Sequence, residues 1–333
     1  MRAAYFRGNE VIELVDIPKP ELAPGEVLIR VGANGVCGSD RKILRGGHDL
    51  VPGHEVSGTV VEVTPGCTTP IGARVAVYIP RYCGVCEYCQ SGRGNLCPNK
   101  PGLLGWATNG GYAEYMALPE RNALRIDDRL TLDQGVLLLD TLGTSSHGLR
   151  LARAAEAGSA LVIGAGPVGM GAVAYLRAVG VPDVYVSELS DYRLEVARGY
   201  GAIPVNPSRE DLETRIRDSH PYGVDLVVEA VGSLPTIWQS FDMVRPGGRI
   251  SLVGEYWGPI TYEGAKRAWM INDITLIRSF YFTIPEFYEN QQMILDGKLN
   301  TAPLASHSYP LEQIAEAYKL FATGNSVKIM VRP

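Results

Sequence analysis

The sequence predicts an α/β protein in which a doubly wound parallel sheet is joined to a separate β-rich domain. Runs of Val, Ile and Thr broken by Gly, Pro and Asn fill the first part of the chain. From about residue 140, short apolar strands alternate with helical stretches. A length of 333 residues with 46% hydrophobic content suits two domains rather than one.

The first domain is predicted to be a twisted antiparallel sheet or partial barrel built from residues 1–141 and 279–333. Its strands include 26–36 and 55–66, where Val and Ile recur between Gly, Pro and Asn. After about residue 280 the pattern becomes mixed again, so we assign the C-terminal segment to this domain. The helices expected in that segment are 285–297 and 311–324.

The second domain is predicted to span residues 142–278 and to hold a parallel sheet covered on both faces. Strands that alternate with helices give this arrangement, because each parallel connection crosses over through a helix. The expected strands are 159–166, 183–188, 224–232, 247–255 and 273–279, and the expected helices are 167–180 and 191–202.

The composition argues against several kinds of partner. The formal net charge is -5, and no run of Lys or Arg forms a footprint for nucleic acid or an anionic membrane. The first residues contain no apolar signal-peptide core, and the apolar runs are too short to span a bilayer. We therefore expect a cytosolic protein with neither a nucleic-acid nor a membrane partner.

A glycine-rich motif, GAGPVG at residues 164–169, follows an apolar strand and opens a predicted helix. Its first glycine allows a tight turn, its second lets backbone approach a pyrophosphate, and its third lets helix and strand pack closely. The helix N-terminus offers free N–H groups to the phosphates. Glu188 lies nineteen residues beyond Gly169, where a carboxylate binds ribose hydroxyls and repels a 2′-phosphate, so NAD is favoured over NADP. The alternative is a turn that only packs.

Four of the six cysteines fall within fifteen residues, in a lobe at 80–100. In a reducing compartment such a cluster indicates a metal site before it indicates disulfides. Four thiolates on one short loop can surround zinc and leave no coordination position open, which is typical of a structural site. The alternatives are unligated thiols or two disulfides, and Cys67 is interpreted as an ordinary free thiol. The four predicted ligands are Cys83, Cys86, Cys89 and Cys97.

The order of motifs along the chain resembles the zinc-containing medium-chain alcohol and polyol dehydrogenase family. GVCGSD, VPGHEVSG, the four-cysteine lobe, GAGPVG, VDLVVEAVG and GGRISLVG follow one another in that family's order over nearly the whole chain. The resemblance implies a β-rich catalytic domain like the chaperonin-10 barrel and a Rossmann domain with a doubly wound parallel sheet.

The resemblance also implies a second zinc, with a catalytic role. Cys37 and His54 match the family's first two ligands, and Asp140 matches the third. Glu55 matches a carboxylate that can replace the zinc-bound water, and Asp40 matches the carboxylate that orients the histidine ligand. Sulfur, imidazole and carboxylate with one open position suit a zinc that acidifies a bound alcohol. Taken singly, His54 could be an interior histidine and Asp140 a helix N-cap.

The proton route implied by the family is incomplete in this chain. Ser39 matches the hydroxyl that takes the alcohol proton in many members. Several alcohol dehydrogenases place a histidine five residues after the zinc cysteine, but Lys42 stands there in this sequence. Either the ribose passes the proton directly to water, or His48 in the loop RGGHDLVP serves as a base. An exposed loop histidine is the alternative for His48.

The glycine loop and the resemblance together predict the contacts to NAD. Thr144 and Val168 match positions that hold the nicotinamide, and Arg193 matches a basic residue at the adenosine ribose. Residues at the carboxyl ends of parallel strands wall the nicotinamide crevice. The full predicted set is Thr144, Gly164, Gly166, Pro167, Val168, Gly169, Glu188, Arg193, Val231, Val253 and Gly254.

The sequence therefore predicts an enzyme with two zinc ions and one NAD per chain that transfers hydride from a secondary alcohol. The acidic third ligand resembles the polyol, sugar and threonine dehydrogenase branches, so a polyol, sugar or cyclitol-like substrate is expected. Ile79, Trp106 and Trp257 are expected to line its pocket. The alternatives are a simple or bulky secondary alcohol, a zinc-free quinone or enone reductase, and a non-catalytic family member. A homodimer or homotetramer is expected from the resemblance alone.

Overall fold

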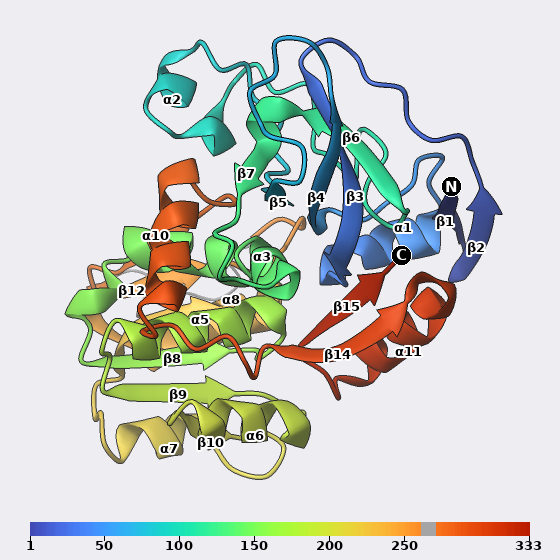
Figure 1. Ribbon diagram of the computed structural model, residues 1–333. Helices are drawn as coiled ribbons and strands as arrows, with labels where there is room; N and C mark the ends of the chain where they lie inside the picture. The colour runs from blue at the N-terminus through green and yellow to red at the C-terminus, as the bar shows by residue number, and fades with distance from the viewer. Residues whose placement is uncertain (261–270) are drawn as a thin grey trace.

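The computed structural model describes residues 1–260 and 271–333. Within these residues the chain forms a six-stranded parallel sheet, a seven-stranded and mostly antiparallel sheet, and a ribbon of β1 (Arg2–Gly8) with β2 (Val11–Asp16). Figure 1 shows the parallel sheet with its helices at the lower left and the second sheet at the upper right. The prediction of two sheets of different kinds is confirmed.

The parallel sheet is doubly wound, with the strand order β10-β9-β8-β11-β12-β13. All residues of β8 are buried, as a strand covered on both faces requires. The strands are β8 (Ser159–Ile163), β9 (Asp183–Ser187), β10 (Ile203–Val205), β11 (Val224–Glu229), β12 (Val244–Leu252) and β13 (Thr275–Arg278). The helices of this part are α4 (Ser145–Leu151), α5 (Pro167–Ala178), α6 (Asp191–Gly199), α7 (Leu212–Arg217) and α8 (Leu234–Met243).

The second sheet has the order β14-β15-β3-β4-β5-β7, and β6 pairs with β3 beside this path. β15 pairs antiparallel with β3, so the end of the chain lies beside its beginning, as the red and blue strands of Figure 1 show. The strands are β3 (Glu26–Gly35), β4 (Glu55–Val63), β5 (Arg74–Val77), β6 (Tyr115–Pro119), β7 (Ala123–Arg125), β14 (Ala305–Pro310) and β15 (Lys328–Arg332). The helices are α1 (Arg41–Gly46), α2 (Glu87–Gln90), α3 (Leu132–Leu137), α10 (Ile284–Leu295) and α11 (Ile314–Thr323).

The largest hydrophobic core is continuous between the two sheets. It contains Tyr78 and Phe282 on one side and Val162 and Val228 of the parallel sheet on the other. The helices and turns at the junction are therefore anchored in one shared core, which gives the side chains they carry fixed positions.

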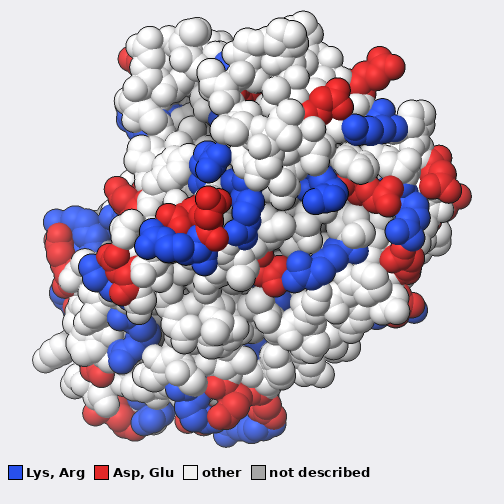
Figure 2. Space-filling view, viewed as in Figure 1, with Lys and Arg blue, Asp and Glu red and all other residues white. Residues whose placement is uncertain are grey.

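Charges of both signs are interspersed on the face shown in Figure 2. Several charged side chains of the molecule form ion pairs, such as Arg332 with Asp133 at 2.6 Å. Among the described residues, no helix combines the length and the apolar character needed to cross a membrane.

Candidate active site

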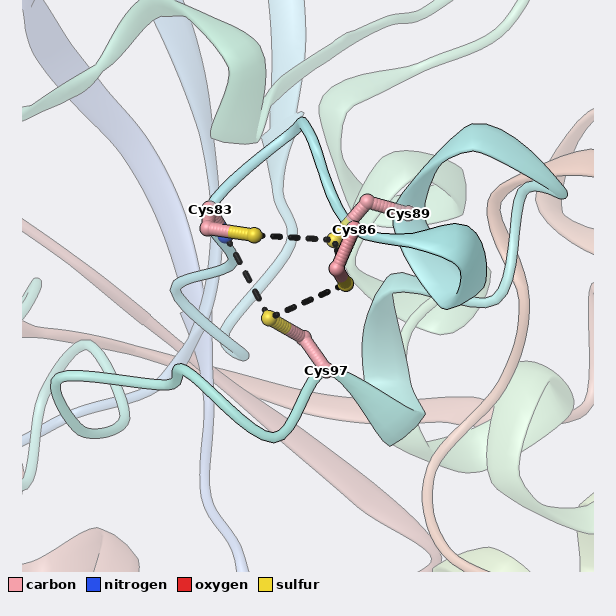
Figure 3. Close-up of side chains that lie close together, drawn as sticks. All are labelled: Cys83, Cys86, Cys89 and Cys97. Carbon is pink, nitrogen blue, oxygen red and sulfur yellow. Dashed lines mark hydrogen bonds between the residues drawn. The ribbon is translucent and has the colours of Figure 1, made fainter.

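The four clustered cysteines converge on one point in the lobe that carries α2 (Figure 3). The Sγ atoms of Cys83 and Cys89 lie 3.8 Å apart, those of Cys86 and Cys89 3.4 Å, and those of Cys86 and Cys97 3.9 Å. A tetrahedron of sulfurs around zinc, with Zn–S bonds of about 2.3 Å, has edges of about 3.8 Å. The spacing therefore fits a structural zinc ion.

The electrostatics of this lobe favour a bound cation. The backbone amides of Val85 and Cys86 lower the pKa of the Cys83 thiol to about 6. Burial, together with the hydrogen bonds between Cys89 and the other three cysteines, raises the pKa of the Cys89 thiol to about 12. A divalent cation removes this conflict by stabilising all four thiolates together.

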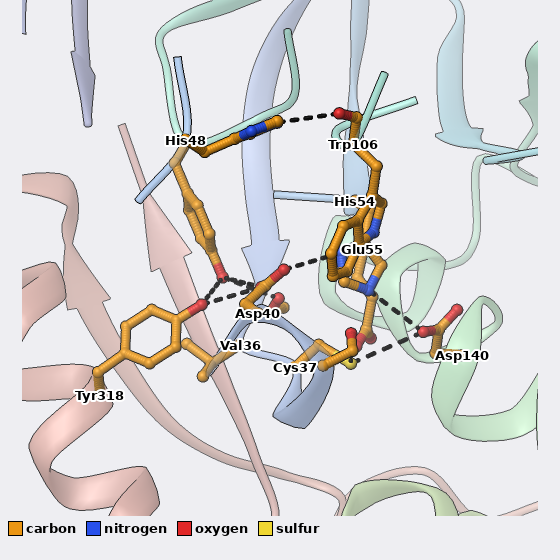
Figure 4. A network of polar contacts seen from close by, with 12 residues as sticks. Val36, Cys37, Asp40, His48, His54, Glu55, Trp106, Asp140 and Tyr318 are labelled. Carbon is orange, nitrogen blue, oxygen red and sulfur yellow. Dashed lines mark hydrogen bonds and ion pairs between the residues drawn. The ribbon is translucent and has the colours of Figure 1, made fainter. Parts of the chain in front are cut away.

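A second group of potential metal ligands forms where three segments distant in sequence meet (Figure 4). Cys37 precedes a 3-10 turn (Gly38–Asp40), and Asp140 begins a π-helical turn (Asp140–Thr144). Glu55 is the first residue of β4, and His54 directly precedes it. One ligand atom from each of these four residues lies within 4.8 Å of all the others. Oδ2 of Asp140 is 3.8 Å from Sγ of Cys37 and 3.4 Å from Nε2 of His54. These are the edge lengths expected for sulfur, nitrogen and oxygen ligands at about 2.0–2.3 Å from one zinc ion.

A cluster of buried polar side chains supports His54 on its Nδ1 side. Oδ1 of Asp40 lies 3.1 Å from Nδ1 of His54, which leaves Nε2 directed toward the other ligands. Oδ2 of Asp40 accepts hydrogen bonds from the hydroxyls of Tyr318 at 2.9 Å and Tyr112 at 3.3 Å. Burial alone would lower the pKa of His54, but the Asp40 carboxylate outweighs it and the pKa is raised well above its usual value. The two tyrosines carry no local sequence signal and were missed by the sequence reasoning.

Glu55 is paired with a lysine that is almost completely buried. Nζ of Lys328 contacts Oε1 of Glu55 and also donates to the carbonyl of Val36 at 3.1 Å. Oε2 of Glu55 has no hydrogen-bond partner among the described residues, and one oxygen of this carboxylate belongs to the metal-ligand group. Burial raises the pKa of Glu55 even though Lys328 opposes this shift. Sequence reasoning missed Lys328 because lysines are rarely buried and nothing in SVKIMV indicates a partner.

The two residues expected on the proton route lie at different distances from the ligand group. Ser39 donates its hydroxyl to Sγ of Cys37 at 3.3 Å, so it lies at the group. His48 is placed beside the carbonyl of Trp106, 2.9 Å from its Nε2. Because a carbonyl only accepts, Nε2 of a neutral His48 carries the hydrogen and only Nδ1 is free to take up a proton.

Not all of the residues expected to line the pocket lie at the site. The ring of Trp106 lies 5.6 Å from that of His54, and Ile79 is buried. Trp257, by contrast, is 79% exposed, so it forms no part of a buried pocket wall.

Trp257 instead takes part in a surface contact between the two sheets. Nζ of Lys42 on α1 donates to Oε1 of Glu255 at 2.8 Å and lies 4.8 Å above the Trp257 ring. Nε1 of Trp257 donates to the same Glu255 oxygen at 2.6 Å. Lys42 therefore takes part in a surface contact that links α1 to the loop after β12. The family resemblance would place a histidine at this position.

The glycine loop has the geometry of a phosphate-binding turn. Gly164 has φ +87°, which favours glycine, and a Cβ at Gly169 would collide with the Gly164 carbonyl oxygen. Glu188 at the end of β9 accepts the N–H of Ala165 at 2.8 Å, and Arg193 lies 3.6 Å from its carboxylate. The acid and base expected at the ribose are therefore adjacent to the loop.

The remaining predicted cofactor residues surround this loop and the Asp140 turn. Val231 packs over Gly164, and Gly254 donates its N–H to the Glu229 carbonyl at the end of β11. A Cβ at Gly171 of α5 would collide with the carbonyl oxygen of Thr141, so the helix that follows the glycine loop lies directly against the turn that holds Asp140. Gly166 is the N-cap of α5, Pro167 and Val168 form its first turn, Thr144 ends the π-helical turn, and Val253 follows β12.

Comparison with known proteins assigns the chain to a family. The profile described as "Alcohol dehydrogenase GroES-like domain" matches residues 23–128, and that described as "Zinc-binding dehydrogenase" matches residues 167–296. The L-threonine 3-dehydrogenase of Pyrococcus horikoshii is 34% identical over 97% of this chain and 94% of its own length. The chain belongs to the zinc-containing medium-chain alcohol dehydrogenase family.

Solved structures agree with this assignment across the whole dehydrogenase. An alcohol dehydrogenase of Thermus sp. ATN1 is 30% identical with a TM-score of 0.93, and each chain covers 100% of the other. A Sinorhizobium meliloti zinc-binding dehydrogenase bound to NADP has 26% identity, and an Escherichia coli alcohol dehydrogenase complexed with NADH has 25%. Each gives a TM-score of 0.89 over 100% of this chain and 99% of its own.

The expected chaperonin-10-like and Rossmann domains are thereby confirmed, since GroES is the chaperonin-10 fold. This dehydrogenase is an oxidoreductase whose cofactors are zinc and a nicotinamide dinucleotide, and both ligand groups have the donor set and spacing for zinc. The rival classes of zinc-free reductase and non-catalytic protein are not supported by these findings.

Proposed function

We propose that this dehydrogenase oxidises a secondary alcohol of polyol, sugar or cyclitol-like type, with NAD as the hydride acceptor. The observation that carries the proposal is the convergence of Cys37, His54, Glu55 and Asp140 within 4.8 Å, against the helix that opens at the glycine loop. In this proposal residues 1–141 and 279–333 form the catalytic domain and residues 142–278 bind the cofactor.

Cys37, His54 and Asp140 would hold the metal, with Glu55 as an exchangeable fourth ligand. When bound, zinc polarises the substrate hydroxyl as a Lewis acid and NAD accepts the hydride. Asp40 keeps the imidazole of His54 in one orientation.

Other residues prepare the site for proton transfer and exclude water. The hydroxyl of Ser39, adjacent to Cys37, is the acceptor we propose for the alcohol proton. The ring of Trp106 excludes water from the side of His54. Nε2 of His48 holds the carbonyl of Trp106 in place. The free Nδ1 of His48 is the atom that would receive a relayed proton.

The adenosine end of the site favours NAD. The Glu188 carboxylate is held by the N–H groups of Ala165, Leu189 and Ser190, so it keeps its negative charge where a 2′-phosphate would lie. Arg193 lies beside the Glu188 carboxylate, where it can contact the ribose. It does not take the place of the Glu188 negative charge.

A second candidate substrate is L-threonine, also a secondary alcohol, and it is favoured by the 34% identity to an L-threonine 3-dehydrogenase over nearly the full length of both chains. The two candidates differ in charge, since threonine carries an ammonium and a carboxylate that a polyol lacks.

One experiment tests both candidates. NAD and NADP reduction is followed against polyols, cyclitols, simple secondary alcohols and L-threonine, with the zinc content measured on the same sample. Removing the zinc is expected to abolish turnover while NADH binding, followed by nicotinamide fluorescence, survives, and adding zinc back should restore the rate. Undiminished turnover by thoroughly demetallated protein would sink the proposal.

We also propose that the chain forms a homodimer or homotetramer through the edge of the parallel sheet. β13 ends that sheet among the described residues, and Leu276 on it and Ile271 before it are 39% and 58% exposed. An apolar edge strand of this kind is prone to pair with another strand. Light scattering should give a multiple of the 36.1 kDa chain mass, and Leu276→Lys should reduce it. A monomeric wild type would contradict this proposal.

A further inference from the structure

The carboxylate of Asp40 lies between His54 and two buried tyrosines (Figure 4). Its Oδ1 is 3.1 Å from Nδ1 of His54, and its Oδ2 accepts hydrogen bonds from Tyr318 at 2.9 Å and Tyr112 at 3.3 Å. Within residues 1–260 and 271–333, no lysine or arginine forms an ion pair with this carboxylate. Neutral hydroxyls therefore satisfy one oxygen of a buried anion, and no cation competes with the imidazole for its negative charge.

Tyr112 also belongs to a segment that is bonded to the chain just before His54. The N–H of Gly111 donates to the carbonyl of Gly53 at 2.9 Å, and the N–H of Tyr112 donates to that of Pro52 at 3.1 Å. A Cβ at Gly53 would lie only 2.9 Å from the Tyr112 ring, so the ring is in close contact with the backbone there. The Tyr112 side chain is therefore fixed relative to the backbone that carries His54.

Aromatic packing fixes where the two hydroxyls lie. The ring of Phe6 is 5.7 Å from that of Tyr112 and 5.3 Å from that of Tyr318, and the two tyrosine rings are 6.2 Å apart. The tyrosine hydroxyls are 2.9 Å from each other, and all three side chains are buried. Because closely packed rings cannot turn without displacing their neighbours, both hydroxyls stay at Asp40. Tyr318 lies on α11, so the C-terminal part of the chain contributes to the surroundings of His54.

We propose that Tyr318 and Tyr112 are positioning residues, which act through Asp40 on His54 and raise the affinity of the candidate catalytic site for zinc. A histidine ligand is oriented and made more basic when its other ring nitrogen faces a carboxylate that is held in place. The tyrosine hydroxyls hold Oδ2 of Asp40, which keeps Oδ1 at Nδ1 of His54. This inference rests on the metal site of the function proposed above, but it concerns retention of the metal and is independent of the substrate.

The test measures zinc binding without turnover. Zinc is partitioned between the protein and a chromophoric chelator of known affinity, and the binding step that Cys37→Ala removes is the one that belongs to the candidate catalytic site. Tyr318→Phe should weaken zinc binding in this step about 10-fold or more, and should leave binding at the four-cysteine lobe unchanged. Tyr112→Phe, which removes the longer contact, should have a smaller effect in the same direction. Tyr200→Phe is the control, since its hydroxyl donates to the Asn300 carbonyl instead, and it should leave both binding steps unchanged.

A double-mutant cycle distinguishes action through Asp40 from a general weakening of the fold. Asp40→Asn keeps the size of the side chain and removes its charge. In that background Tyr318→Phe should change zinc affinity by less than about 2-fold, because the two residues act in one network. An equal loss of affinity in both backgrounds, or wild-type affinity in Tyr318→Phe, would overturn the role of the tyrosines. A wild-type protein that binds no zinc in the step removed by Cys37→Ala would instead overturn the proposed function.

Discussion

Lys328, a side chain with almost no access to water, offsets negative charge around the candidate metal-ligand group. The side chains of Lys328 and Glu55 are 1% and 0% exposed. Taking two ions out of water costs several kcal/mol for each, and their attraction offsets this only while both are present. Lys328 opposes the rise in the pKa of Glu55 that burial causes, and it holds this carboxylate beside Cys37, His54 and Asp140.

Replacing Lys328 by Met should leave Glu55 as an uncompensated buried charge. We expect the free energy of unfolding to fall by about 3–5 kcal/mol, measured by urea denaturation. Lys319→Met, an exposed lysine on α11, is the matched control and should change stability little. Adding Glu55→Leu to the Lys328 variant should recover part of the loss. Equal stability of the two lysine variants would contradict this account.

At the residue scale, the candidate ligands and Asp40 were predictable, but Lys328 and the two tyrosines that contact Asp40 were not. Cys37, His54 and Glu55 stand in short motifs whose order along the chain is informative. Lys328 reaches Glu55 across 273 positions, and Tyr318 reaches Asp40 across 278. No periodicity or spacing brings such residues together, because tertiary packing of the C-terminal strand and helix determines the contact.

At the scale of elements, the strands and helices with a clear hydrophobic period were predicted well. α10 was expected at 285–297 and spans Ile284–Leu295, and the helix expected at 311–324 is a short 3-10 turn followed by α11 (Ile314–Thr323). The π-helical turn at Asp140–Thr144 was not predicted, since its residues are also compatible with an ordinary helix start. Asp140 begins that turn and makes no capping bond, so its side chain is free to face His54.

A buried hydrogen bond between His147 and Glu286 joins α4 to α10 and gives stability a defined dependence on pH. Nδ1 of His147 lies 2.8 Å from Glu286, which also accepts the N–H of Thr283 in a capping box. Burial raises the pKa of Glu286, but the hydrogen bonds from His147 and Thr283 outweigh it and the pKa is lowered from 4.5. The depressed pKa means that the ionised carboxylate stabilises the fold above about pH 4.5, and this contribution is lost as the pH falls further.

Glu286→Gln should therefore cost about 1.5–3 kcal/mol at neutral pH, the usual contribution of hydrogen bonds to a charged group. The difference in melting temperature from wild type should shrink as the pH is lowered from 7 to 3. Glu289→Gln, on the same helix but 59% exposed, is the control. Melting curves for Glu286→Gln that run parallel to wild type across this pH range would refute the assignment.

At the scale of the whole molecule, the cysteine lobe supports the segment that leaves the parallel sheet. Asn95 binds the Phe280 carbonyl, and the N–H of Ile284 at the start of α10 reaches the carbonyl of Gly92 at 3.3 Å. Figure 1 shows the lobe beside the end of α10. The sequence indicated that the last segment returns to the first sheet, but not that the lobe holds the connection. The contacts are made by Gly92 and Asn95, which lie between the cysteines but are not among the predicted ligands.

The surface contact among Lys42, Glu255 and Trp257 has a consequence for how the cofactor enters. Glu255 directly follows Val253 and Gly254, so a nicotinamide seated against those residues lies just inside the contact. A charge pair and a cation–ring contact in water are each weak, so thermal motion can part them without disturbing the shared core. Dissolved ions weaken the charge pair further. We therefore expect this contact to open readily, and the exchange of dinucleotide to be faster at higher salt.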